Sequence, residues 1–95
     1  MIIEWAEEAL DDLQGLYAYV SFDNPLAAQK LAMNIVNSVE TNLPENPHIG
    51  RPGRISGTRE LVITGTSYIV PYRVHSGVIQ VLRVYHGARR WPDRM

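Results

Sequence analysis

The sequence predicts a small α+β domain, in which an N-terminal strand and a two-helix antiparallel hairpin pack on a small antiparallel β-sheet. Two observations predict this fold. Apolar residues recur at intervals of three and four through residues 6–43, which is the period of an amphipathic helix. Between residues 58 and 86 the period changes to strand-like runs separated by turn residues. A chain of 95 residues is expected to form one domain, residues 1–95.

The N-terminal half is interpreted as a strand followed by two helices. The apolar start at residues 2–5 predicts the strand, and a helix with carboxylates in its first turns follows to residue 20. Gly15 weakens the middle of that helix by up to about 1 kcal/mol relative to alanine, so the helix depends on packing. Asn24 is expected to cap a second helix that begins at Pro25 and is stopped by Pro44. With so short a link, the helices should form an antiparallel hairpin whose apolar stripe another element covers.

The segment from Pro44 to Gly57 is predicted to be an irregular loop, because its prolines and glycines let neither helix nor strand persist. Compact domains rarely keep so long a loop without a use for it. This loop also carries Arg51 and Arg54. Two interpretations stay open, a functional loop and a plain crossover from the helices to the sheet.

A three-stranded meander is predicted after the loop. Its strands are expected at residues 58–64, 68–75 and 78–86. A two-residue Ser-Gly turn before the last strand would place Arg73 opposite Gln80, and Arg73 and Arg83 would then point to opposite faces. Pro71 cannot donate a ladder hydrogen bond, so its strand should be irregular or unpaired at that position.

The composition excludes several classes of protein. The chain has no cysteine, which excludes disulfides, thiolate nucleophiles and thiolate metal sites, and which is compatible with a reducing cytoplasm, the expected localisation. Its acidic N-terminus does not resemble a signal peptide. The longest apolar runs fall far short of the roughly 20 residues that cross a bilayer, so no membrane association is expected.

The two halves of the chain carry opposite charge, although the whole chain has a net charge of −1. Residues 1–50 hold eight carboxylates against one lysine, a net charge of −7, and residues 51–95 hold eight arginines against two carboxylates, a net charge of +6. Every basic residue of the second half is an arginine, and the planar guanidinium suits carboxylates and phosphates. The arginines are expected to gather into a cationic surface for an anionic partner. The alternative is that they balance the acidic helices.

No motif predicts a metal or cofactor. His48, His75 and His86 are scattered, and the chain contains no phosphate loop, dinucleotide fingerprint or nucleophile elbow. Neither a metal nor a cofactor is therefore expected.

The residue types that can carry chemistry lie in residues 83–92. His86, at the end of a predicted strand, could act as a general acid or base near neutral pH, with arginines stabilising a phosphodiester transition state. Tyr85 or Trp91 could stack on a base. A structural role fits equally well, with Trp91 folded onto the core and His86 as a polar side chain at the strand's end.

Taken together, five stretches of the sequence resemble the RelE/ParE toxin family, and they span nearly the whole chain. They are IEWAEEALDDL in residues 3–13, NPLAA in 24–28, GRPGRISGTREL in 50–61, YIVPYRV in 68–74 and VLRVYHGARRWP in 81–92. The resemblance implies a growth-inhibiting toxin of a type II toxin–antitoxin system, of the kind linked to plasmid stabilization. It also implies a cognate antitoxin, encoded beside the toxin, through which alone the complex would contact operator DNA.

The family divides by target, and the sequence favours the ParE-like branch. RelE-like members cut messenger RNA in the ribosome, whereas ParE-like members poison DNA gyrase without being enzymes. RelE-like nucleases carry an arginine as the second residue of a Y-R-L-V-Y strand, where this chain has Ile69, which cannot neutralise a phosphate. The scarcity of lysine and the net charge of −1 also disfavour docking on the ribosome, because affinity for nucleic acid depends on phosphate neutralisation.

Two alternatives stay open. His86 matches the position of a catalytic histidine in some ribosome-dependent relatives, so an endoribonuclease would use His86 as acid or base, with Arg73, Arg83, Arg89 or Arg90 as phosphate clamps. The third interpretation is a growth-neutral module that retains only antitoxin binding.

An antitoxin is expected to cover the apolar surface of the helical hairpin and the arginine-rich end of the sheet. An acidic partner segment is favoured there by the opposite charges of the two halves. The residues expected to bind the target or the antitoxin are Arg51, Arg54, Arg59, Arg83, Tyr85, Arg89, Arg90 and Trp91.

Overall fold

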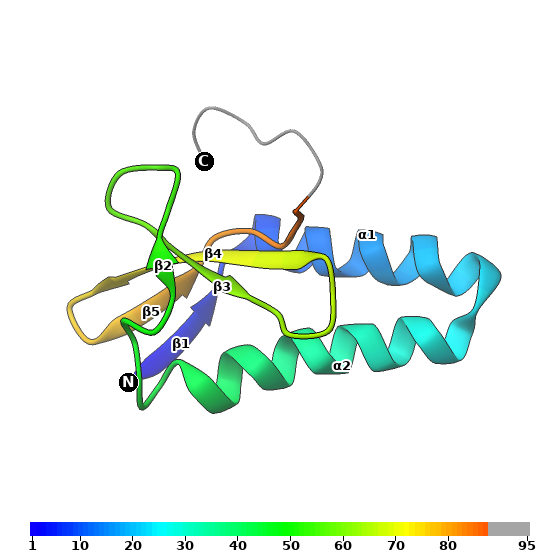
Figure 1. Ribbon diagram of the computed structural model, residues 1–95, viewed down its shortest axis with the longest axis horizontal. Helices are drawn as coiled ribbons and strands as arrows, with labels where there is room; N and C mark the ends of the chain where they lie inside the picture. Colours follow the sequence, from blue (N-terminus) through cyan, green and yellow to red (C-terminus); the bar gives the residue numbers. More distant parts are fainter. Residues whose placement is uncertain (88–95) are drawn as a thin grey trace.

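The computed structural model describes residues 1–87, and Figure 1 shows how their helices and strands are arranged. In chain order the elements are β1 (Ile2–Trp5), α1 (Glu7–Asp23), α2 (Pro25–Asn42), β2 (Arg51–Pro52), β3 (Arg59–Val62), β4 (Tyr68–His75), β5 (Val78–Val81) and β6 (Tyr85–His86). The strands form one sheet in the order β1-β5-β4-β3-β2, with β6 paired to β4. The predicted α+β fold is therefore confirmed.

Helices α1 and α2 form the expected hairpin and lie side by side in Figure 1. Asn24 separates them. Its side-chain Oδ1 accepts a hydrogen bond from the backbone N–H of Ala27 at 3.1 Å, and Pro25 occupies the first turn of α2, as predicted. Among the described residues, neither helix is both long and apolar enough to reach across a lipid bilayer.

The core lies between the helical hairpin and one face of the sheet. Even-numbered residues of β4, such as Val70 and Tyr72, face the helices, so odd-numbered residues such as Ile69 and Arg73 lie on the helix-distal face. The buried core consists of Ala9, Leu16, Ile35, Val39, Leu43, Leu61, Ile63, Val70, Tyr72, Ile79, Val81 and Val84.

Strand β1 makes the sheet mixed, whereas the sequence predicted an antiparallel sheet. It pairs with β5 in parallel, from Ile2 opposite Val78 to Trp5 opposite Val81. The backbone N–H of Ala6 then donates to the carbonyl of Val81 at 2.9 Å, where the chain turns into α1. The first and last parts of the chain thus meet in the sheet, a long-range pairing that residue patterns did not indicate.

The prediction of one continuous last strand over residues 78–86 is wrong, because the chain leaves the ladder at residues 82–84. Tyr72 pairs with Val81 and Tyr68 pairs with His86, so β4 advances by four residues while the later strand advances by five. The extra residue makes a bulge. The bulge lies beside Pro71. The carbonyl of Pro71 accepts a hydrogen bond from the N–H of Leu82 at 2.9 Å, but Pro71 has no N–H with which to donate one in return. The predicted irregularity at Pro71 is confirmed.

The turn between β4 and β5 is the predicted two-residue turn. Ser76 and Gly77 both have positive φ, 50° and 78°, as a tight hairpin with right-handed strand twist requires. Arg73 consequently lies opposite Gln80, as expected from the register.

The sequence predicted that no strand persists between Pro44 and Gly57, but Arg51 and Pro52 form the short strand β2 against β3. The long loop between α2 and β2 is held to the sheet by Tyr72. The hydroxyl of Tyr72 accepts a hydrogen bond from the N–H of Gly50 at 2.9 Å and donates one to the carbonyl of Pro47 at 2.8 Å. A Cβ at Gly50 would stand 2.6 Å from that hydroxyl, so only glycine fits there. Burial raises the pKa of Tyr72 despite the opposing effects of the Gly50 N–H and the charge of Arg59, and the protonated hydroxyl is the form that donates.

Replacement of Tyr72 by phenylalanine is expected to lower the free energy of unfolding by about 1–3 kcal/mol, because it leaves a buried N–H of the loop without its acceptor. Thermal denaturation measures the loss. Tyr17→Phe is the matched control, since Tyr17 is 43% exposed and should change the stability little. Equal melting temperatures for the wild type and Tyr72→Phe would show that this hydroxyl does not hold the loop.

Candidate functional site

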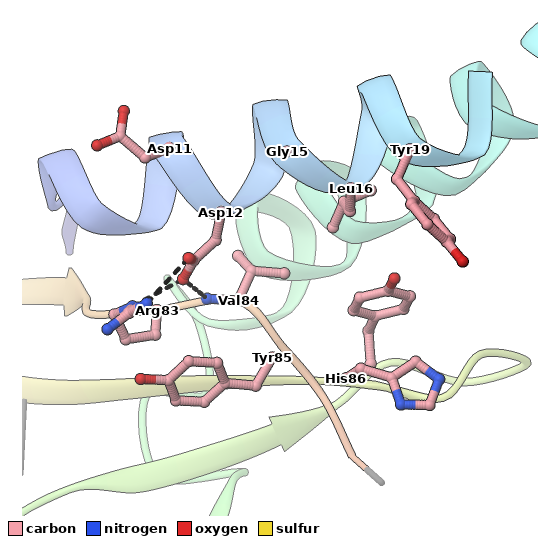
Figure 2. Close-up of a pocket in the computed structure, with 10 residues that line it drawn as sticks. Asp11, Asp12, Gly15, Leu16, Tyr19, Arg83, Val84, Tyr85 and His86 are labelled. Atoms are coloured by element: carbon pink, nitrogen blue, oxygen red, sulfur yellow. Dashed lines mark hydrogen bonds and ion pairs between the residues drawn. The ribbon is translucent and has the colours of Figure 1, made fainter. Parts of the chain in front are cut away.

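A cleft of about 660 Å³ lies between α1 and the end of the sheet where the chain has left the β5 ladder (Figure 2). Helix α1 forms one wall, and the bulge with β6 and the start of β4 forms the other. The cleft is lined by Asp11, Asp12, Gly15, Leu16, Tyr19, Tyr68, Arg83, Val84, Tyr85 and His86. It contains three of the predicted residues, Arg83, Tyr85 and His86.

A second hollow of about 570 Å³ adjoins the cleft and extends it toward α2 and the β3–β4 turn. The two share Tyr19, Tyr68 and His86, so together they form one elongated groove along α1. We refer to the two hollows together as the α1 groove.

An ion pair between Asp12 and Arg83 closes one side of the α1 groove. Arg83 Nε donates to Asp12 Oδ2 at 2.7 Å, and Arg83 Nη2 donates to Asp12 Oδ1 at 3.0 Å, which is a bidentate arrangement. Asp12 Oδ2 also accepts the backbone N–H of Val84 at 3.0 Å. The hydrogen bonds that Arg83 donates to Asp12 raise the pKa of Arg83 despite its partial burial. One carboxylate therefore holds the bulge and neutralises the arginine, as Figure 2 shows.

Aromatic rings complete the groove. The guanidinium carbon of Arg83 lies 4.7 Å from the centre of the Tyr85 ring, a cation–π contact. The rings of Tyr68 and His86 meet edge to face, with centroids 5.3 Å apart. Burial raises the pKa of Tyr85, and the charge of Arg83 opposes that shift. Tyr85 and His86 are thus held in place by neighbours within the chain.

The described arginines do not gather into the single cationic surface expected from the sequence. Arg51 and Arg54 lie against Glu60, whose carboxylate is 3.0 Å from Arg51 Nη2 and 3.8 Å from Arg54 Nε. Arg59 Nη1 donates to the backbone carbonyls of His48 at 3.2 Å and Gly50 at 2.9 Å.

The other two described arginines lie elsewhere. Arg73 Nε donates to Gln80 at 3.0 Å on the helix-distal face, while Arg83 reaches α1, so they turn to opposite sides of the sheet as predicted. Of the predicted arginines that fall within residues 1–87, only Arg83 lines the α1 groove. Arg89, Arg90 and Trp91 lie outside the described residues.

Sequence reasoning missed the carboxylates that organise these arginines. Glu60 is 3% exposed and also accepts the backbone N–H of Arg54 at 2.9 Å, so it holds the loop as well as two guanidiniums. Glu60 is the only carboxylate in residues 51–87, among five arginines, and this feature of the sequence could have indicated its role. Asp12 gave no such signal, because it is one of several carboxylates on an acidic helix.

Ile69, the position at which RelE-like nucleases carry an arginine, also has apolar surroundings in the structure. Ile69 lies on the helix-distal face, is 8% exposed, and pairs with Val62 on one side and Tyr85 on the other. The residue two places along β4 on that face is the buried Pro71. Within residues 1–87, no three His, Asp or Glu side chains lie close enough together to hold a metal ion.

Comparisons with known proteins agree with this geometry. The family model for the ParE toxin of the type II toxin–antitoxin system, parDE, matches residues 3–91. The chain belongs to this toxin family. Two relatives support the assignment. The toxin homologue Y4kP of Sinorhizobium fredii is 42% identical over 96% of this chain and 93% of its own, and Toxin RelE2 of Caulobacter vibrioides is 33% identical over 92% and 96%.

A solved structure shares the toxin's fold. It is that of the chromosomal ParDE toxin–antitoxin system from P. aeruginosa, which superposes with a TM-score of 0.81 at 29% identity and covers 90% of this chain and 95% of that one. The mixed sheet and the helical hairpin are therefore the fold of this family. The resemblance drawn from the sequence is confirmed at the level of a type II toxin of the RelE/ParE family.

Removal of the Asp12 carboxylate is expected to destabilise the toxin more than removal of both charges of the ion pair. Asp12→Ala leaves Arg83 and the N–H of Val84 without their acceptor in a partly buried place and should cost about 2–3 kcal/mol of unfolding free energy. Adding Arg83→Met to Asp12→Ala should recover part of that loss. Urea denaturation of the two single variants and the double variant measures the coupling. Strictly additive losses would contradict the interaction.

Proposed function

We propose that this toxin inhibits growth by poisoning DNA gyrase without itself cleaving a bond, and that a cognate antitoxin holds it inactive. The match of the ParE toxin model to residues 3–91 carries the proposal. The chromosomal ParDE system of P. aeruginosa, at 29% identity, supports the same branch.

The chemistry of the described surface supports a binding role more than phosphodiester cleavage. A nuclease has to neutralise the negative charge that builds up on a phosphate in the transition state. Here Ile69 and Pro71 occupy the helix-distal face of β4 beside Arg73, which is hydrogen-bonded to Gln80. Arg83 already carries the Asp12 carboxylate as its counter-ion. Using Arg83 as a phosphate clamp would require breaking a bidentate ion pair.

A ribosome-dependent endoribonuclease is the second candidate. His86 lines the α1 groove with its ring edge to face on that of Tyr68, so an imidazole and a phenol ring lie together where a base could stack. The 33% identity to Toxin RelE2 of Caulobacter vibrioides also favours it. In this alternative Arg73, 3.0 Å from Gln80 on the opposite side of the sheet, would have to act apart from His86.

A supercoiling assay with purified gyrase separates the two candidates. Added toxin is expected to inhibit supercoiling and to leave linear DNA after protein digestion, because a trapped cleavage complex releases broken DNA. Prior mixing with the protein encoded by the adjoining gene should restore supercoiling. Gyrase that is unaffected by a micromolar excess of toxin would exclude the proposal.

Induction of the toxin in cells tests the alternatives. Ribosome-dependent cuts in messenger RNA after induction of the toxin, mapped by primer extension, would establish the nuclease instead. Normal growth after induction without the antitoxin would identify a module that only retains antitoxin binding. Any effect on operator DNA is expected only in the presence of the antitoxin.

A further inference from the structure

Gly15 lies in the middle of α1 at a place where nothing within residues 1–87 requires glycine. It is exposed, its φ is not in the left-handed region, and a Cβ added there would meet nothing within 4 Å. Glycine in a helix interior is nevertheless less stable than alanine. Figure 2 places Gly15 on α1 between Asp12 and Tyr19. Gly15 lines the groove, and the space that a side chain would occupy there is open, which we call the gap.

Gly15 lies between an acidic and an aromatic part of the same face of α1. Residues 8, 12, 15, 19 and 22 recur at steps of three and four, so they form one stripe along the helix. Toward the N-terminal end the stripe and its neighbour Asp11 carry carboxylates. Toward the C-terminal end it carries Tyr19 and Phe22, which are 75% and 91% exposed. Two large aromatic side chains this exposed, next to a groove, form a surface suited to a partner.

The charge of the stripe is negative. Within residues 1–87, Glu8, Asp11 and Asp12 on this part of α1 carry three negative charges, and Arg83 carries one positive charge beside them, which is a net charge of −2 for these four side chains. Asp12 is occupied by its ion pair, whereas Asp11 turns away from Arg83 at the rim (Figure 2). A partner segment with a basic residue fits this rim, and an acidic segment is repelled by it.

We propose that a segment of the antitoxin crosses α1 at Gly15, packs an apolar side chain on Tyr19 and Phe22, and places a lysine or arginine beside Glu8 and Asp11. The inference rests on the proposed function in that it takes the antitoxin as the partner. It assigns to the α1 groove a segment that is apolar and basic, whereas the charge of the two halves had favoured an acidic one. Gly15 is then the point where the two backbones approach most closely.

Substitution at Gly15 should change stability and affinity in opposite directions. Gly15→Ala fits the space and is a better helix former, so the melting temperature is expected to rise by about 4–8 °C. Gly15→Leu fills the gap and is expected to weaken binding of the protein encoded by the adjoining gene by at least about tenfold, a change of about 1.4 kcal/mol. Calorimetric titration measures the affinity of each variant.

Gln14→Leu is the matched control, because it adds the same exposed side chain one position along α1, outside the groove. It should change the affinity less than about twofold. An equal loss for Gln14→Leu and Gly15→Leu would overturn the proposal, since the loss would then not depend on the gap.

The charge of the rim has its own test. Asp11→Lys is expected to weaken binding about tenfold at low salt and less at high salt, while Glu40→Lys, the same change of charge at an exposed position of α2, should have little effect. Tighter binding by Asp11→Lys would show that the partner segment is acidic and would overturn the proposal.

Two further outcomes are distinguishable. If the wild-type toxin does not bind the adjoining gene's product at all, the proposed antitoxin partnership fails before any variant is compared. If Gly15→Leu leaves that affinity unchanged but abolishes self-association in sedimentation, the groove takes a second copy of the chain, which also overturns the proposal.

Discussion

The structure of the site depends on the carboxylate of Asp12. It accepts hydrogen bonds from Arg83 Nε, from Arg83 Nη2 and from the backbone N–H of Val84, all within 3.0 Å. The need for it arises at Pro71, which cannot return the hydrogen bond it receives from Leu82, so the chain leaves the ladder there. A helix residue supplies the acceptor that the sheet no longer offers, and α1 is thereby fixed beside β6 with the groove between them.

Like Arg83, most of the other described arginines of the second half of the chain bind groups within the protein. Composition suggested a surface of available guanidiniums, but the described ones are used at separate places to hold the fold. Glu60 organises Arg51 and Arg54, and Arg59 binds the carbonyls of the long loop. A guanidinium that satisfies a buried carboxylate or several carbonyls stabilises the structure and contributes less to attracting an anionic partner. The acidic wall of α1 then becomes the more distinctive electrostatic feature of the groove.

Local patterns predicted most of the fold. The helical period, the Asn24 cap, the strand Tyr68–His75 and the two-residue turn after it are all properties of neighbouring residues, and all are confirmed. The parallel pairing of β1 with β5 joins residues more than 70 positions apart, and no pattern in either segment indicates the partner. The sequence did not predict the interruption of the last strand at residues 82–84. It predicted only an irregularity on the neighbouring strand, at Pro71, which lacks a backbone N–H donor.

The site was predicted less completely than the fold. Arg83, Tyr85 and His86 were found because their residue types are chemically distinctive near a strand end. The residues of α1 that line the groove were not predicted. Asp12 resembles its acidic neighbours in the sequence, and Gly15 only indicates a less stable position of a helix until the space around it is known. Such residues acquire their roles from the element that packs against them, which tertiary structure alone defines.

Hydrogen exchange at the amide of Val84 tests whether the Asp12 carboxylate holds the bulge. Slow exchange is expected in the toxin, comparable with that of the paired amides of β5, because Asp12 Oδ2 accepts this N–H. Exchange as fast as in the exposed turn at Ser76 and Gly77 would show that the carboxylate of Asp12 does not hold the bulge, and the arrangement of the groove derived from it would fail.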